Sequence, residues 1–212
     1  MDEGAPVPLH DSWERNRGMP PWQAGAGFLR PAVAALVLLA ALAVAAPVSA
    51  SLLRPLSIHD LTQRSDVVIR GQVVAVRTVS SNGGRMPVTL AEIEVLEVLS
   101  GTLPPRRRLL VTQPGGVANG IELDYAGRPI FTAGEETVLF LQQRAPGRFI
   151  PVGLAQGKYN VGPAGSGGDR SLRRDLNGAA LAGAAPEATA ATLAELRARV
   201  SATPRNLGGG RP

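Results

Sequence analysis

The chain has 212 residues, a formal charge of +5 and no cysteine, which excludes disulfides, thiolate metal sites, iron–sulfur clusters and a cysteine nucleophile. Both tryptophans, Trp13 and Trp22, precede the longest apolar run, so the core of a domain beyond that run must be aliphatic. Lys158 is the only lysine, and the positive charge therefore comes from arginines spread along the chain. This spread favours an arginine-rich composition over a dedicated anion-binding site as its cause.

An apolar segment at residues 32–46 predicts a signal peptide. It reads AVAALVLLAALAVAA, follows Arg30 and precedes a small-residue pattern that ends at Ala50. The run is shorter than the roughly 20 residues that span a bilayer, so cleavage is expected between Ala50 and Ser51. Export would leave the protein in the periplasm, at the cell surface or in the medium. The alternatives are an uncleaved signal anchor that tethers the chain to the membrane and a true translation start at Met19.

A long β-hairpin is predicted at the start of the exported domain. Residues 67–79 and 88–99 are rich in β-branched side chains and are separated by the turn signal Asn82–Gly83. Gly71 is expected to mark a bulge or tight bend in the first strand. A second bulge is expected beyond Val95, because the alternation of apolar and polar residues slips there. Bent strands of this kind are typical of small barrels.

Shorter strands, bounded by Gly and Pro, are predicted after the hairpin. They are expected at residues 107–113, 121–125, 136–142, 149–154 and 158–161. Segment 136–142 is apolar on both faces, which is typical of a central strand with Phe140 in the core. Frequent turn signals without helical repeats favour a sandwich or a small barrel.

Helices are predicted at both ends of the β region. A capping-box pattern at Ser57 starts a short helix that ends near Ser65, and a second such pattern, Thr192 with Glu195, lies in a helix that Pro186 is expected to open. The expected organisation is a leader at 1–50, a β-barrel domain at 51–161, a Gly/Ala-rich linker with a short strand at 162–185, a helix at 186–201 and a disordered tail at 202–212.

Four segments carry a resemblance to a known kind of domain: SDVVIRGQVVAV, EIEVLEVLSG, GEETVLFLQQ and GLAQGKYNV. From Leu56 to Val161 the chain resembles exported bacterial proteins with a single OB-like barrel, similar in layout to netrin modules and tissue inhibitors of metalloproteinases. The resemblance implies a mainly β fold with an OB-like barrel of five to six strands, a short N-terminal helix and a C-terminal helix. Those inhibitors chelate the protease metal through an amino-terminal cysteine. The expected terminus here is Ser51, so that mechanism does not carry over.

Catalytic groups are scarce in the expected mature chain. His59 is its only histidine and lies in a helix cap, where a capping or surface role is favoured. Glu135 and Glu136 would point to opposite faces of a strand, so they do not form a pair of acids. An exported enzyme that uses carboxylates such as Asp124 or Glu122 is one alternative, and it would need them in a closed cleft with raised pKa values. No metal or cofactor is expected.

Arg106, Arg107 and Arg108 form the one basic cluster considered for ligand binding. OB barrels commonly bind oligonucleotides or oligosaccharides, but the few aromatic residues leave little for base stacking, so nucleic acid is not expected as a partner. The cluster is expected to solvate a strand start and hinder edge pairing, with contact to anionic envelope glycans as the alternative. The sequence thus favours an exported, non-enzymatic binding module whose ligand is an exported or surface protein, a protease being one candidate.

Overall fold

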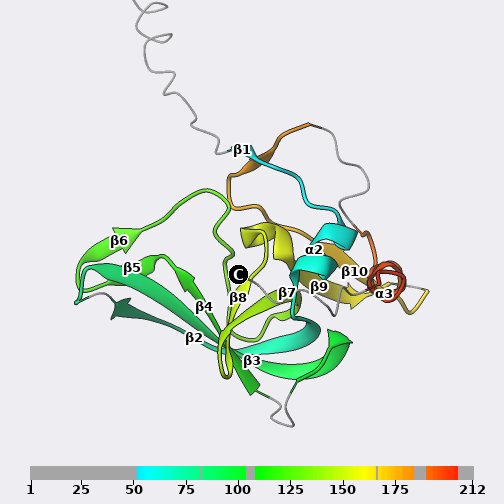
Figure 1. The fold of residues 1–212 in the computed structure, drawn as a ribbon, viewed down its shortest axis with the longest axis horizontal. Coiled ribbons are helices and arrows are strands. Elements are labelled where there is room, and N and C mark those ends of the chain that lie inside the picture. Colours follow the sequence, from blue (N-terminus) through cyan, green and yellow to red (C-terminus); the bar gives the residue numbers. More distant parts are fainter. Residues whose placement is uncertain (1–51, 82, 104–107, 166, 184–189, 205–212) are drawn as a thin grey trace, which may run out of the picture. The chain divides into compact units, whose positions relative to one another are not determined.

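The computed structural model describes residues 52–81, 83–103, 108–165, 167–183 and 190–204 (Figure 1). The strands are β1 (Leu52–Leu53), β2 (Val67–Ser81), β3 (Met86–Gly101), β4 (Arg108–Pro114), β5 (Gly116–Ala118), β6 (Ile121–Leu123), β7 (Glu136–Ala145), β8 (Arg148–Pro151), β9 (Lys158–Ala164), β10 (Arg170–Arg173) and β11 (Ala180–Leu181). The helices are α2 (Ile58–Arg64), the 3-10 helix η2 (Leu154–Gly157) and α3 (Leu193–Ser201). The predicted signal peptide and the cleavage point between Ala50 and Ser51 lie outside the described residues.

Five strands close into a ring. In the order β7, β2, β3, β4 and β8, each strand is hydrogen-bonded to the next, and β8 returns to pair with β7. Only the β4–β8 pairing is parallel, and it is short, joining Leu110 to Arg148 and Val111 to Phe149. β9 and β10 extend the sheet beyond β7. The prediction of a mainly β fold is confirmed, with a ring-like sheet of five strands.

Bulges bend the β2–β3 hairpin, as predicted. A Cβ atom on Gly71 would lie 2.6 Å from Ile93 Cγ2 and 2.7 Å from the Glu94 carbonyl oxygen, so glycine is what lets β3 pass this close. The register shifts beside Gly71, where β3 carries an extra residue beyond Val95, and again at Val74 in β2. These extra residues curl both strands so that the sheet can close on itself.

The core consists of two apolar clusters. One lies between the sheet and the helices and includes Ile58, Leu61, Val68, Phe140, Tyr159 and Leu196. The other includes Ile69, Val73, Ile93, Val111, Leu139 and Phe149 from the strands of the ring. Phe140 is fully buried, as predicted. The predicted capping box of α2 is also present, with Ser57 and Asp60 bonding reciprocally.

The region predicted to be a linker contributes strands to the fold. β9 continues past the expected boundary at Val161 to Ala164, β10 pairs with it antiparallel, and β11 pairs parallel with β1. Strand pairing here satisfies backbone groups that a flexible linker would leave to water. The strand predicted at residues 121–125 is shorter, since β6 ends at Leu123, and it pairs with β5, a short strand that was not predicted.

The C-terminal helix begins later than predicted. α3 starts at Leu193, because the side chain of Thr192 caps it by accepting a hydrogen bond from the Glu195 N–H. Of the earlier part of the predicted helix, residues 184–189 lie outside the described chain, and Ala190 is not helical. At the start of the tail predicted to be disordered, Thr203 is buried and its hydroxyl donates to the Arg199 carbonyl oxygen. Within the described residues no helix is long and apolar enough to cross a bilayer.

Candidate functional site

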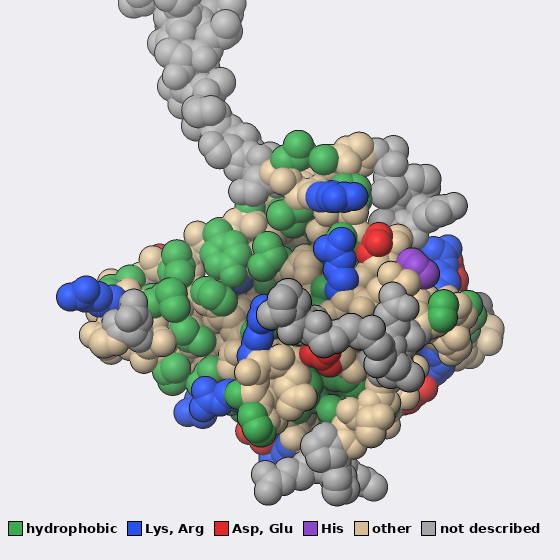
Figure 2. All heavy atoms as spheres, viewed as in Figure 1, with side chains coloured by type: hydrophobic (Ala, Val, Ile, Leu, Met, Phe, Trp, Pro, Cys, Tyr) green, Lys and Arg blue, Asp and Glu red, His purple; other side chains and the backbone are tan. Residues whose placement is uncertain are grey.

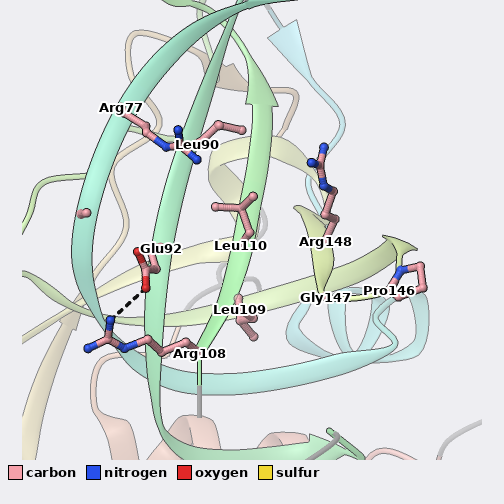
Figure 3. A pocket seen from close by; sticks show the side chains of 10 residues that line it. Arg77, Leu90, Glu92, Arg108, Leu109, Leu110, Pro146, Gly147 and Arg148 are labelled. Carbon is pink, nitrogen blue, oxygen red and sulfur yellow. Dashed lines mark hydrogen bonds and ion pairs between the residues drawn. The ribbon is translucent and has the colours of Figure 1, made fainter. Parts of the chain in front are cut away.

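A groove of about 380 Å³ opens on the face of β2, β3 and β4 that points away from the core of the ring (Figure 3). Its floor includes Leu90 and Leu110, both half-buried. Figure 3 shows Arg77 of β2 on one side of these leucines and Arg148 of β8 on the other. The turn between β7 and β8, at Gly147, closes the side of the groove next to Arg148.

Cross-strand pairing places these side chains in two neighbouring rows on one face of the sheet. Arg77 pairs with Leu90 across β2 and β3, and Leu110 pairs with Arg148 across β4 and β8. Glu92 of β3 pairs with Leu110 between them. Because paired residues of adjacent strands project to the same face, all of these side chains reach the groove.

The groove has an excess of positive charge. Three guanidinium groups line it, those of Arg77, Arg108 and Arg148, and they face one carboxylate, that of Glu92. Arg108 Nη1 lies 3.0 Å from Glu92 Oε1, and both side chains are well exposed, so this ion pair is weak. In the described part of the chain, Arg77 and Arg148 have no ion-pair partner. An anionic ligand would therefore find two unneutralised guanidinium groups on opposite sides of an apolar floor.

Of the predicted arginine cluster, Arg108 lines the groove. Arg106 and Arg107 lie outside the described residues. Sequence reasoning missed Arg77 and Arg148, whose separate positions in the chain give no sign that they meet across one surface. The sequence signal for these two residues is the alternation of apolar and polar residues in β2 and β8, which puts both arginines on an outward face.

The carboxylates considered for catalysis do not form a cleft. Glu122 and Asp124 are exposed, and Asp124 Oδ1 accepts a hydrogen bond from Arg128 Nε at 2.8 Å. This hydrogen bond is the main cause that lowers the pKa of Asp124, the opposite of the raised pKa that a general acid needs. His59 is exposed on α2. Across the described residues, no three His, Asp or Glu side chains are grouped to hold a metal ion.

Lys158 lies in a second, smaller hollow of about 180 Å³. Its Nζ atom is 3.0 Å from Glu135 Oε1, donates a hydrogen bond to Asn160 and lies 5.5 Å from the centroid of the Phe131 ring. Burial lowers the pKa of this lysine, against the effect of Glu135. Glu136, by contrast, binds Arg70 and Arg170, so the two adjacent glutamates form separate ion pairs and not a pair of acids.

Exposed apolar side chains gather over β5 and β6 (Figure 2). Val117 and Ile121 of this hairpin are 62% and 40% exposed. Exposed aliphatic residues are ordinary on a protein surface, so this patch does not by itself define a ligand. The groove is therefore the stronger candidate for a binding site.

No family model matches this chain, and no curated protein is significantly similar to it. The features that bear on function are therefore those of the groove: its leucine floor, its position on the ring, and Arg77 and Arg148, which have no ion pair within the described residues.

Proposed function

We propose that the chain is an exported, non-enzymatic binding module of the OB type, and that its groove binds an acidic segment of another protein. The observation that carries this proposal is the arrangement of Arg77, Arg108 and Arg148 around a leucine floor with a single carboxylate. Electrostatic complementarity of this kind steers an acidic partner to the site and fixes its orientation.

The strand order supports the OB assignment. OB barrels are closed or partly open five-stranded Greek-key sheets that bind ligands on the face of their second and third strands, between two loops. Here β3 and β4 are the second and third strands of the ring in chain order, and the groove lies on them. The β7–β8 turn beside it takes the place of one of the two loops. The proposed relation to netrin-type domains rests on this order and on the spacing of the strands.

The lining favours a peptide over a nucleic acid or a glycan. None of the lining residues is aromatic, so a nucleobase has no planar side chain on which to stack. Leu90 and Leu110 would contact apolar side chains, which an acidic peptide has and an anionic polysaccharide lacks. An acidic peptide that also carries apolar residues satisfies both the floor and the arginines.

Binding of a defined probe tests this function. The probe is a fluorescein-labelled octapeptide of alternating glutamate and valine, and its anisotropy is measured against the purified protein at low and at physiological salt. We expect saturable binding that weakens with salt and that falls about tenfold or more in the Arg77→Ala/Arg148→Ala variant, because charge-assisted hydrogen bonds are lost.

The matched control is Arg64→Ala/Arg144→Ala, which removes the same charge from exposed positions outside the groove. Equal binding by the two double variants would refute the groove as the site. Tighter binding of a uronic acid polymer than of the octapeptide would move the assignment to anionic glycans. Export is tested separately, by N-terminal sequencing of the secreted chain, which is expected to begin at Ser51.

A further inference from the structure

The distal half of β2 is a sheet edge. β2 pairs with β3 along its whole length, to Ser81↔Met86, whereas its pairing with β7 ends at Gln72↔Glu136. The last backbone contacts on the β7 side are made by Val73, with Gly134 and Glu135. Among the described strands, none pairs with the outer side of β2 from Ala75 to Ser81.

Two local features cause β2 to leave the ring at this point. The preceding turn, which ends at Gly134 with a positive φ of 87°, brings β7 alongside β2 only from Glu136 onward. The bulge at Val74 then changes the direction of β2. In Figure 1 the distal halves of β2 and β3 extend away from the helices, and no ribbon runs along the outer side of β2.

This edge has few of the features that block pairing with another chain. The segment from Ala75 to Ser81 reads AVRTVSS, and it contains no proline, no lysine and one charged residue, Arg77. Its valines and threonine favour extended backbone. An edge strand of this length presents a row of unpaired N–H and C=O groups to any extended segment that can lie beside it.

We infer that residues Ala75–Ser81 form a β-augmentation edge, on which an acidic partner segment adds as a further strand with its carboxylates facing the groove. The inference rests on the proposed function and specifies how the ligand lies: extended, beside β2, with alternate side chains on the two faces of the sheet. Side chains on one face would lie beside Arg77, and those on the other face beside Val76.

The charge on this edge favours an acidic partner over a second copy of the chain. Two β2 edges paired with each other would bring two Arg77 side chains to neighbouring positions, and like charges across strands are destabilising. An acidic segment would instead neutralise Arg77, for which the described chain supplies no ion pair. The backbone of the partner supplies affinity, and its carboxylates supply specificity.

Backbone methylation of the probe tests the inference. In an added strand, alternate residues direct their N–H groups toward the sheet. Methylating that alternate set removes every hydrogen bond that the peptide donates to β2 and puts methyl groups between the strands, whereas methylating the other set leaves these hydrogen bonds intact. Two versions of the glutamate–valine octapeptide are therefore compared, one N-methylated at the valines and one at the glutamates. We expect one version to bind at least about tenfold more weakly than the other. Equal affinities for the two versions would overturn the inference.

Amide hydrogen exchange gives a second readout on the intact protein. Binding of the unmethylated octapeptide is expected to slow exchange within Ala75–Ser81, and exchange that stays unchanged there would also overturn the edge assignment. If exchange is unchanged but the Arg77→Ala/Arg148→Ala variant still loses binding, the groove remains the site and only the strand addition fails. If the octapeptide does not bind at all, the proposed function fails with it.

Discussion

A chain of alternating charges joins four strands and the C-terminal helix, and removing its carboxylate at Glu97 tests how much it stabilises the fold. The chain runs through Arg170, Glu136, Arg70, Glu97 and Arg197, with N···O distances of 2.6, 2.7, 2.8 and 2.7 Å. Glu97 accepts hydrogen bonds from Arg70 and, through both of its oxygens, from Arg197 of α3. The perturbation is Glu97→Gln, which keeps the shape of the side chain and removes its charge.

The expected loss follows from partial burial. The side chain of Glu97 is 31% exposed and that of Arg70 is 22% exposed, so the network lies between a surface pair and a buried one. Hydrogen bonds to charged groups contribute about 1.5–3 kcal/mol and exposed ion pairs about 0.2–1 kcal/mol. We expect Glu97→Gln to lower the free energy of unfolding by about 2 kcal/mol at pH 7, measured by urea denaturation with circular dichroism. Glu94→Gln is the control, because Glu94 lies on the same strand and has no ion pair in the described chain.

The stability difference between wild type and Glu97→Gln is expected to depend on pH. The hydrogen bond from Arg197, followed by that from Arg70, lowers the pKa of Glu97 below its ordinary value of 4.5. The Glu97 carboxylate is therefore protonated at lower pH in the folded protein than in the unfolded chain. Its stabilising effect is present above pH 4.5 and is lost as the pH falls through the pKa of Glu97 in the folded state. The difference between wild type and Glu97→Gln should shrink below pH 4.5. A difference that stays constant from pH 7 to pH 3, or one no larger than that of Glu94→Gln, would refute the reasoning.

Three further substitutions test the packing, the buried lysine and the first helix by urea or thermal denaturation. Gly71→Ala places a methyl group 2.6 Å from Ile93 Cγ2 and should cost about 2–3 kcal/mol; wild-type stability would show that the strands can separate without penalty. Lys158→Met keeps the apolar stem but leaves Glu135 without its partner, and should cost about 2 kcal/mol, which an unchanged melting temperature would contradict. Ser57→Ala removes the N-cap of α2 and should cost about 1 kcal/mol, with a loss under 0.3 kcal/mol counting against the capping role.

The elements that sequence reasoning predicted well are those specified by local pattern. The β2–β3 hairpin and its bulge near Gly71 follow from period-two alternation and from a glycine in the middle of a strand. The segment after Val161 was predicted to be a Gly/Ala-rich linker with a short strand, and it contains the end of β9 and two short strands, β10 and β11. At Gly162, a Cβ atom would clash with Ser171 Oγ of β10. Composition indicates flexibility, whereas glycine in this segment allows β9 and β10 to approach closely.

The groove was beyond sequence reasoning because it depends on long-range pairing. Arg77 reaches the same surface as Arg148 only because β8 returns to pair with β4, and that contact spans two residue pairs. Nothing in the segments around either arginine distinguishes it from the other exposed arginines of the chain. Arg108 was identified from a run of three arginines, and its neighbours in space, Leu110 and Glu92, were not part of that pattern.

In the proposed binding mode, the two halves of β2 have separate roles, one in stability and one in recognition. The proximal half, through Val73, is buried between β7 and β3 and carries Arg70 of the ionic network. The distal half, from Ala75, pairs on one side only and carries Arg77. Since the bulge at Val74 separates them, an extended segment can bind to the distal edge without breaking any pairing of the ring. A binding edge on the proximal half would require β7 to leave, which would expose the core. In the proposed binding mode, the same strand therefore holds the ring together at one end and accepts a partner at the other.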